Sequence, residues 1–327
     1  MDDPRAARTV LGDVPADTLG RTDYHEHLFQ VSPLLPGDEL DDEQRSRDEA
    51  AALHSAGIDA IIDATPVGLG RDPAGLARIS ARTGLHVVAA TGAHREEHYP
   101  AGHWLHELSV PQLVERFIAD VTEGMPARDR PTPETAATGP AGKPVRAGIL
   151  KAGAGYWSLT AFTKRVLAAV AEAHAQTGAP VMVHLEHGSA AFEVLNMLVG
   201  SAVPAEAVVL AHVDRNPDPG LHAELAAAGA YLGYDGPARS RSWPDSILLD
   251  CMVAAAGLGA AERLLLGGDV ARRSRYTAYG GLPGMAYLPR RFIPRLEQRT
   301  DPAFVRQVLV TNPARLLGRR WITPPRE

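Results

Sequence analysis

The sequence predicts an α/β fold, a single-domain (β/α)8 TIM barrel covering residues 1–327. Short apolar segments alternate with helical patterns along the chain, and the repeat length suits strand and helix units of such a barrel. The apolar segments also lack strict in-out alternation, which is typical of parallel strands buried on both faces. With 327 residues, 45% of them hydrophobic, the chain is long enough for one large core.

The expected elements follow one another in order. The first strand carries His25, and the charged segment 41–57 after it turns apolar and ends in glycine, as an amphipathic helix does. Residues 125–144 are rich in Pro, Gly, Ala and Thr, which indicates a surface insertion, with mobility left open. Further strands are expected at 58–63, 85–90, 146–151, 180–184, 207–212, 231–235 and 263–269, and further helices at 73–82, 112–122, 160–177, 190–198, 221–228 and 245–256.

Composition narrows the class of protein. A net charge of −6, from 33 Lys and Arg against 39 Asp and Glu, argues against nucleic acid or an acidic membrane surface as a partner. The single cysteine, Cys251, cannot form an internal disulfide and fits a reducing cytosol. We find neither a signal-peptide pattern nor an apolar run of about 18 residues. We therefore expect a soluble cytoplasmic protein that acts on a small molecule.

Residues that bind metals recur at the ends of the predicted strands. His25 and His27 lie one residue apart on a strand, so both side chains point to the same side. Catalytic groups of a (β/α)8 barrel lie at the carboxyl ends of its strands. Imidazole nitrogens and carboxylates there can bind borderline metals. The strand-end set is His25, His27, Lys151, His184, His212 and Asp269.

Short motifs surround this set in a specific order. They are Thr9–Gly12, Leu19–Gly20, His25–Phe29, Gly148–Lys151, Val183–His184, Ala211–His212, Gly268–Asp269 and Thr311–Arg315. Over nearly the whole chain, this order resembles the phosphotriesterase-like family of the amidohydrolase superfamily. The resemblance implies a hydrolase with two divalent metal ions, zinc in the first place and manganese, cobalt or iron as alternatives. It also implies a homodimer.

The resemblance assigns roles to the ligands by position. His25, His27 and Asp269 would hold the buried metal, and His184 and His212 the more exposed one. Two such metals activate a bridging hydroxide and polarise the substrate.

Two further roles follow from the resemblance. Lys151 would bridge the metals after carboxylation, because a carbamate has two anionic oxygens whereas an ammonium cannot ligate. Asp269 would be catalytic, accepting the proton as hydroxide attacks. Taken alone, a lysine at a strand end is most often a surface or salt-bridged residue, and only the place of Lys151 in the set favours a ligand. Glu26, between the two histidines, points away from them and is expected to be structural.

The loops after the seventh and eighth strands are rich in arginine. Some members of the family that open phosphorylated sugar lactones look similar there, and Arg241 and Arg272 match their basic residues. Arg275 departs from the pattern because it stands where a tyrosine is expected, with Tyr276 one residue later. Because arginine suits bidentate contacts with anions, we expect an anionic substrate, with phosphate, carboxylate and sulfonate all open.

Further predictions concern other side chains in the loops at the carboxyl end of the predicted barrel. Arg239 and Arg273 are expected to be solvated surface charges. His94 and Tyr99, after the third strand, are candidates for lining the pocket. Tyr156 and Trp157 follow Lys151 closely and either form an aromatic wall or pack under the loop.

The sequence thus predicts a binuclear metal-dependent hydrolase of an ester-like bond, a lactonase or carboxylic esterase for an anionic substrate, phosphorylated substrates included. An organophosphate triesterase (aryldialkylphosphatase) or an amide hydrolase could use the same site. A single-metal deaminase would lack the bridging lysine. A catalytically silent barrel that acts as a binding protein is the alternative from another class.

Overall fold

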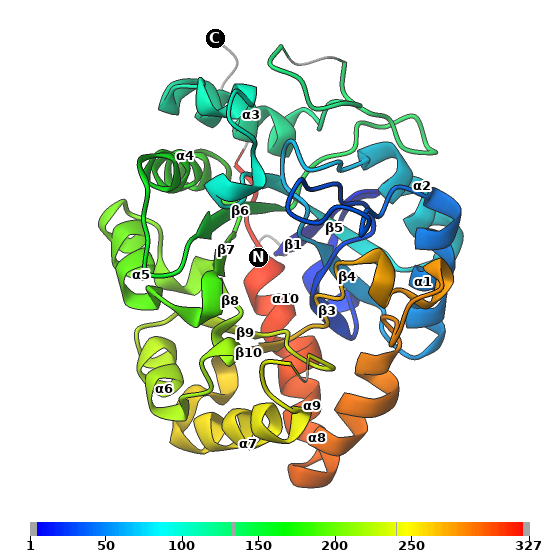
Figure 1. Cartoon of the computed structure of the whole chain (residues 1–327), viewed down its shortest axis with the longest axis vertical. Helices are drawn as coiled ribbons and strands as arrows, with labels where there is room; N and C mark the ends of the chain where they lie inside the picture. The colour runs from blue at the N-terminus through cyan, green and yellow to red at the C-terminus, as the bar shows by residue number, and fades with distance from the viewer. Residues whose placement is uncertain (1–4, 133–134, 240, 323–327) are drawn as a thin grey trace.

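Eight parallel strands form the central sheet of the computed structural model, which describes residues 5–132, 135–239 and 241–322. Each strand pairs with the next along the chain, and helices surround the sheet (Figure 1). The predicted (β/α)8 barrel is therefore confirmed. The strands are β3 (Thr22–Glu26), β4 (Ala60–Asp63), β5 (His86–Gly92), β6 (Ile149–Ala154), β7 (Val181–Leu185), β8 (Val208–Ala211), β9 (Tyr231–Tyr234) and β10 (Leu264–Leu266).

The first and last strands meet just beyond β10. The backbone N–H of Asp269 donates to the His25 carbonyl at 2.8 Å, and that of Gly268 donates to Asp23 Oδ1 at 3.2 Å. A Cβ atom at Gly268 would lie 2.2 Å from Glu26 Oε1, so a larger residue would displace this carboxylate. The Gly-Asp pair therefore closes the barrel at the level of the predicted ligands.

The predicted helices form, with ends shifted by a few residues. None of the helices in the described ranges combines the length and apolar character that crossing a membrane requires. They are α1 (Glu43–Ser55), α2 (Pro73–Thr83), α3 (Val110–Thr122), α4 (Ala161–Thr177), α5 (Ala191–Gly200), α6 (Pro219–Ala227) and α7 (Asp245–Ala255).

Local sequence signals set the ends of α2. The Asp72 side chain accepts from the Gly75 N–H at 2.9 Å, and Pro73 occupies the first turn. Such caps satisfy backbone groups that have no partner within the helix. Gly84, with a φ of +79°, ends the helix in the left-handed conformation.

Two strands and three α-helices were not predicted. They are the hairpin of β1 (Ala6–Thr9) and β2 (Gly12–Pro15), and three C-terminal helices, α8 (Ile293–Arg299), α9 (Pro302–Arg306) and α10 (Asn312–Leu317). Each covers too few residues to show a clear hydrophobic period. Pairing and packing with distant segments, not local pattern, decide their structure.

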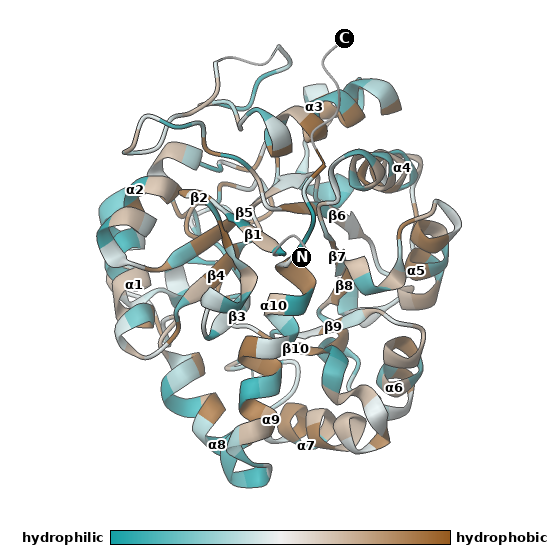
Figure 2. Ribbon diagram, turned by 180° about the vertical axis from the view of Figure 1, so that it is seen from behind, coloured by the Kyte–Doolittle hydropathy of each residue, from teal (hydrophilic) through white to brown (hydrophobic). Residues whose placement is uncertain are grey.

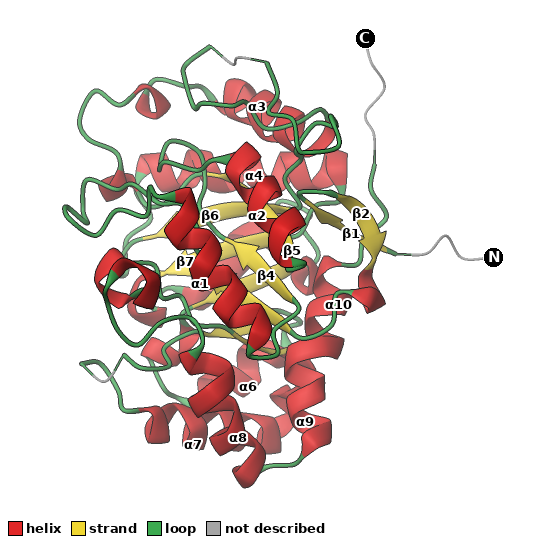
Figure 3. Ribbon diagram, turned by 90° about the vertical axis from the view of Figure 1, so that its right-hand side faces the viewer, coloured by secondary structure: helices red, strands yellow, loops and turns green. Residues whose placement is uncertain are grey.

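Two apolar layers hold the barrel together. Inside it, Tyr24, Met182 and Leu265 pack with one another and with Leu316 of α10, and a second layer lies between strands and helices. In both views along the short axis, α10 lies over the centre of the barrel (Figures 1 and 2). The side view places α10 and the hairpin at the same end (Figure 3). They cover the end of the barrel at which the strands begin, so the opposite end, where the strands terminate, is the one that can hold an active site.

The described part of the insertion 125–144 is anchored to the barrel through Asp129. This carboxylate accepts from Arg71 Nη2 at 2.8 Å, from Arg116 Nη2 at 2.9 Å and from the Gly68 N–H at 2.9 Å. The side chains of both arginines are buried, at 2% and 4% exposure. Mobility was left open by the sequence, but this network fixes the segment around Asp129; residues 133 and 134 lie outside the described ranges.

Candidate metal centre and active site

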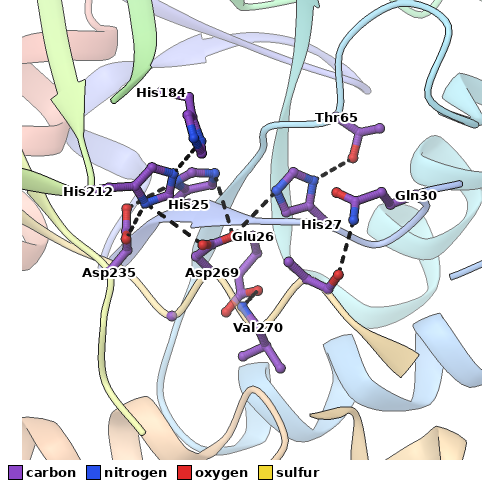
Figure 4. Close-up of polar contacts among 12 residues, drawn as sticks. His25, Glu26, His27, Gln30, Thr65, His184, His212, Asp235, Asp269 and Val270 are labelled. Carbon is purple, nitrogen blue, oxygen red and sulfur yellow. Dashed lines mark hydrogen bonds and ion pairs between the residues drawn. The ribbon is translucent and has the colours of Figure 1, made fainter. Parts of the chain in front are cut away.

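The six predicted ligands come together at the carboxyl end of the barrel, and five of them are labelled in Figure 4. All six are buried, with exposed fractions from 0% for Lys151 to 7% for His184. Parallel strands present their final residues at one edge, so side chains distant in sequence meet there. His25 lies on β3 with His27 just after it, Lys151 on β6, His184 on β7, His212 just after β8 and Asp269 three residues after β10.

Hydrogen bonds fix which nitrogen of His25 and His27 faces the centre. His27 Nδ1 lies 2.7 Å from Thr65 Oγ1, whose own proton goes to a backbone carbonyl, so the hydroxyl oxygen accepts from His27. His25 Nδ1 donates to Asp235 Oδ2 at 3.1 Å. Both Nε2 atoms therefore carry lone pairs, and they lie 3.8 Å (His25) and 3.6 Å (His27) from Asp269 Oδ1.

The nitrogens of His184 and His212 that face each other are both acceptors. His212 Nδ1 donates to Asp235 Oδ1 at 2.5 Å, and His184 Nε2 donates to Glu186 Oε2 at 2.9 Å. Burial lowers the pKa of His212 to about 3 and that of His184 well below its usual value, so each ring carries a single proton. The remaining nitrogens lie 2.8 Å apart with lone pairs facing, which is favourable only around a cation.

These residues fit divalent metal ions. One ligand atom from each of His25, His27 and Asp269 lies within 4.8 Å of the other two. The ring centroids of His25 and His212 are 5.0 Å apart, so the pair formed by His212 and His184 adjoins this group. Each of the four imidazoles also has its outer N–H held by an oxygen atom, which is how proteins orient metal-binding histidines.

Asp235, directly after β9, is a candidate functional residue that the sequence analysis missed. Its carboxylate accepts hydrogen bonds from Tyr24, His25 and His212, so it orients ligands of both groups. Burial works to raise the pKa of Asp235, but the imidazoles of His212 and His25 hold it well below its usual value. The rule that found the other strand-end residues applies equally to this carboxylate.

Lys151 has no carboxylate partner among the described residues. Its Nζ lies 3.5 Å from His25 Nε2 and 3.1 Å from Met182 Sδ, and the side chain is fully buried. Burial lowers the pKa of Lys151 to about 8, against a weaker opposing effect of Asp269. The alternative of a salt-bridged lysine is therefore not found, and burial makes this amine easier to deprotonate than an exposed lysine.

Asp269 is held by two arginines on its outer side. Arg239 Nη2 donates to Asp269 Oδ2, and Arg215 Nη2 donates to the same oxygen at 3.2 Å. Burial works to raise the pKa of Asp269, but the guanidinium of Arg239 and the ring of His25 hold it well below its usual value. The expectation of a solvated Arg239 is wrong, because its side chain is only 23% exposed and paired with Asp269.

A pocket of about 550 Å³ adjoins Asp269. Four arginines line it, and three of them are residues predicted to bind substrate. Such a concentration of positive charge suits an anion. Its lining consists of Ala238, Arg239, Arg241, Ser242, Arg272, Ser274, Arg275 and Leu282.

The two tyrosines predicted to bind substrate require correction. Tyr276 is fully buried and its hydroxyl donates to the His27 carbonyl. Tyr99 is 3% exposed, and its hydroxyl donates to the Val67 carbonyl at 3.0 Å and accepts from the His94 N–H at 2.9 Å. Both hydroxyls are thus occupied in holding loops. His94 does lie beside the centre, with its ring centroid 4.6 Å from that of His184.

A profile described as the phosphotriesterase family matches residues 5–317. The chain belongs to the phosphotriesterase family. A phospho-furanose lactonase from Mycoplasmopsis synoviae is 30% identical, with 95% of this chain and 91% of that protein covered. The membership and such relatives indicate a hydrolase.

Solved structures of the family show the same barrel. A lactonase from Listeria monocytogenes superposes with a TM-score of 0.85 at 28% identity, covering 96% of this chain and 99% of that chain. The phosphotriesterase homology protein from Escherichia coli, solved with phosphate in its active site, superposes with a TM-score of 0.81 at 26% identity, covering 91% of this chain and 99% of that chain.

Behind the centre, this phosphotriesterase-family chain buries two acidic residues. Asp23 Oδ1 accepts from the His25 N–H at 3.1 Å, and Glu26 Oε2 accepts from the Val270 N–H at 3.0 Å. Burial raises the pKa of Asp23 to about 8 and that of Glu26 well above its usual value. Both acids hold backbone segments in place, and Glu26 has the structural position expected from the sequence.

Proposed function

We propose that the chain is a binuclear metal-dependent lactonase whose substrate is an anionic lactone that carries a phosphate group. One observation carries the proposal. Four imidazoles with free lone pairs lie together, and a pocket lined by four arginines adjoins them. The relative named a phospho-furanose lactonase supports the lactonase activity, and the E. coli structure with phosphate in its active site supports the phosphorylated substrate.

In this proposal His25, His27 and Asp269 hold one ion, and His184 and His212 hold the other. When bound, the two ions would activate a water molecule for attack and polarise the substrate carbonyl. Zinc is the first choice, since imidazole and carboxylate suit it, with manganese, cobalt and iron as alternatives.

Lys151 is proposed to be carboxylated and to bridge the two ions. Its burial and lowered pKa support this, because a neutral amine, not an ammonium, reacts with carbon dioxide. The product carbamate is an anion with two ligand oxygens, and it would adjoin the lone pair on His25 Nε2.

The chain's own acid and base groups have separate roles. Asp269 is proposed to accept a proton at its carboxylate and return it to the leaving oxygen. Arg239 lies between this carboxylate and the pocket, so an anion in the pocket competes with Asp269 for its guanidinium. Arg241, Arg272 and Arg275 line the same pocket and would orient the anion.

The test is hydrolysis by the metal-loaded protein across a neutral lactone, a phosphorylated sugar lactone, an aryl ester, an N-acyl amino sulfonate and a neutral organophosphate triester. We expect the highest kcat/KM for the phosphorylated lactone. Losing a hydrogen bond to a charged group costs roughly 1.5–3 kcal/mol, so Arg241→Ala and Arg272→Ala should each raise its KM about 10- to 100-fold.

KM for the neutral lactone should stay within about twofold in both variants. Arg273→Ala is the matched control, because Arg273 belongs to the same loop but packs over the Tyr279 ring, with its guanidinium carbon 5.6 Å from the ring centroid. A preference for the neutral triester, or for the sulfonate amide, would replace the proposal by the triesterase or amide hydrolase alternative.

A further inference from the structure

A second hollow, of about 610 Å³, lies at the same end of the barrel. Residues of the loops after β6, β7 and β8 form it, whereas the arginine pocket belongs to the loops after β9 and β10. We call it the aromatic hollow. Its lining consists of Tyr156, Trp157, Glu186, His187, Ser189, Arg215 and Asn216.

Three rings are held open to solvent in the aromatic hollow. Tyr156 and Trp157 are 62% and 64% exposed, and the His187 side chain is 63% exposed. The rings of Tyr156 and His187 meet edge to face, with centroids 5.8 Å apart. Neighbouring large aromatic side chains left exposed at a functional face indicate a binding surface and not packing under the loop.

The backbone keeps these rings in place at an energetic cost. Trp157 and His187 both adopt the left-handed region, with φ of 46° and 53°, which is uncommon outside glycine. The Trp157 N–H donates to Ser189 Oγ at 3.0 Å, and the Ser189 hydroxyl donates to the Glu186 carbonyl at 2.7 Å. Strain of this kind persists where surrounding contacts fix it and is concentrated at binding sites.

The polar wall of the aromatic hollow touches the proposed metal ligands. Glu186 Oε2 accepts from His184 Nε2 at 2.9 Å, and Arg215 Nη2 donates to Asp269 Oδ2 at 3.2 Å. Asp269 Oδ2 also accepts from Arg239, which lines the arginine pocket. Each hollow therefore contributes an arginine that donates to Asp269 Oδ2.

We propose that the aromatic hollow is a second substrate subsite that binds a sugar ring attached to the anionic lactone. A sugar presents an apolar C–H face to Trp157 and Tyr156 and hydroxyl groups to the polar wall. The amide of Asn216 makes no side-chain hydrogen bond within the described residues, so it is available for such a hydroxyl. An aromatic ring would leave these polar groups unpaired.

The inference rests on the proposed lactonase function, and it predicts a substrate of two rings. Its test compares KM for two phosphorylated sugar lactones that share the reacting ring, one of them carrying an additional glucosyl group. A ring contact of this type corresponds to about a 3- to 10-fold change in affinity. Trp157→Ala should raise KM for the two-ring lactone by about that factor, with KM for the one-ring lactone unchanged.

Two further variants separate stacking from general surface effects. Trp157→Phe keeps an aromatic face and should recover most of the lost affinity. Leu258→Ala removes another exposed apolar side chain, 61% exposed beyond α7, and should change neither KM. Equal KM values for the two lactones in the wild type, or equal effects of Trp157→Ala on both, would overturn the inference.

A binding experiment keeps the subsite testable without turnover. Cellobiose is titrated into the metal-loaded protein while tryptophan fluorescence is recorded, with phenol as the aromatic comparison. A change with cellobiose that Trp157→Ala abolishes supports the subsite even if neither lactone is hydrolysed, in which case only the lactonase proposal fails. No response to cellobiose, or a stronger response to phenol, overturns the sugar subsite.

Discussion

Replacing Asp235 by asparagine should weaken metal binding without removing any ligand. The carboxylate accepts from His25 Nδ1 at 3.1 Å and from His212 Nδ1 at 2.5 Å, and also from the Tyr24 hydroxyl. An amide has a single acceptor oxygen, and its NH2 group donates. At least one of the two imidazoles therefore faces a donor in Asp235→Asn and loses the hydrogen bond that fixes its tautomer.

The expected decrease in metal affinity follows from the loss of that hydrogen bond. Removing the outer hydrogen bond of a metal-binding histidine typically lowers metal affinity 10- to 100-fold, which is about 1.4–2.8 kcal/mol. The assay is competition for zinc with a chelator of known affinity, followed by activity as a function of free zinc. Activity should recover substantially at saturating zinc, because all six proposed ligands are still present.

Asp214→Asn is the matched control. Asp214 is also fully buried, but its Oδ2 accepts only backbone N–H groups, those of Asp235 at 3.0 Å and of Gly236 at 2.7 Å. Burial raises the pKa of Asp214 to about 8, so an uncharged amide reproduces its state near neutral pH. Zinc affinity in Asp235→Asn within twofold of the wild type, or an equal loss in Asp214→Asn, would refute the orienting role of Asp235.

Three further predictions concern catalysis, the insertion and pH. Lys151→Ala and Asp269→Asn should keep the circular dichroism of a folded barrel while kcat falls by orders of magnitude; near-normal turnover would contradict the metal site. Asp129→Asn removes one anionic partner from each of two buried arginines, Arg71 and Arg116, which both keep Asp120, and should lower the free energy of unfolding by about 1–3 kcal/mol in urea denaturation, against less than about 1 kcal/mol for the exposed Asp48→Asn. The raised pKa of Asp23, from 3.8 to about 8, means that the folded chain retains a proton that the unfolded chain releases. The stability of the metal-free protein should therefore fall as pH rises from about 4 to about 8, by up to ~1.4 kcal/mol per pH unit, and Asp23→Asn should flatten this slope. An unchanged slope would show that Asp23 is ionised in the fold.

The sequence alone determined the barrel and was enough to predict the set of strand-end residues. Strand and helix signals depend on residues a few positions apart, such as the Asp72 cap and the Gly84 stop of α2, so they are legible locally. The rule that strands of a barrel present their final residues at one edge then brings His184 and His212 together without coordinates. The structure adds that their facing nitrogens lie 2.8 Å apart.

Only the tertiary structure decided how these groups face one another. Asp235 lies 210 residues from His25 in sequence, and Arg239 lies 30 residues from Asp269, so neither contact leaves a local pattern. Burial of the Tyr276 hydroxyl against the His27 carbonyl likewise depends on how the last loop packs on the first. Tautomers, pKa shifts and the open rings of the aromatic hollow follow from such contacts, because electric fields and burial are set by neighbours in space and not by neighbours in the chain.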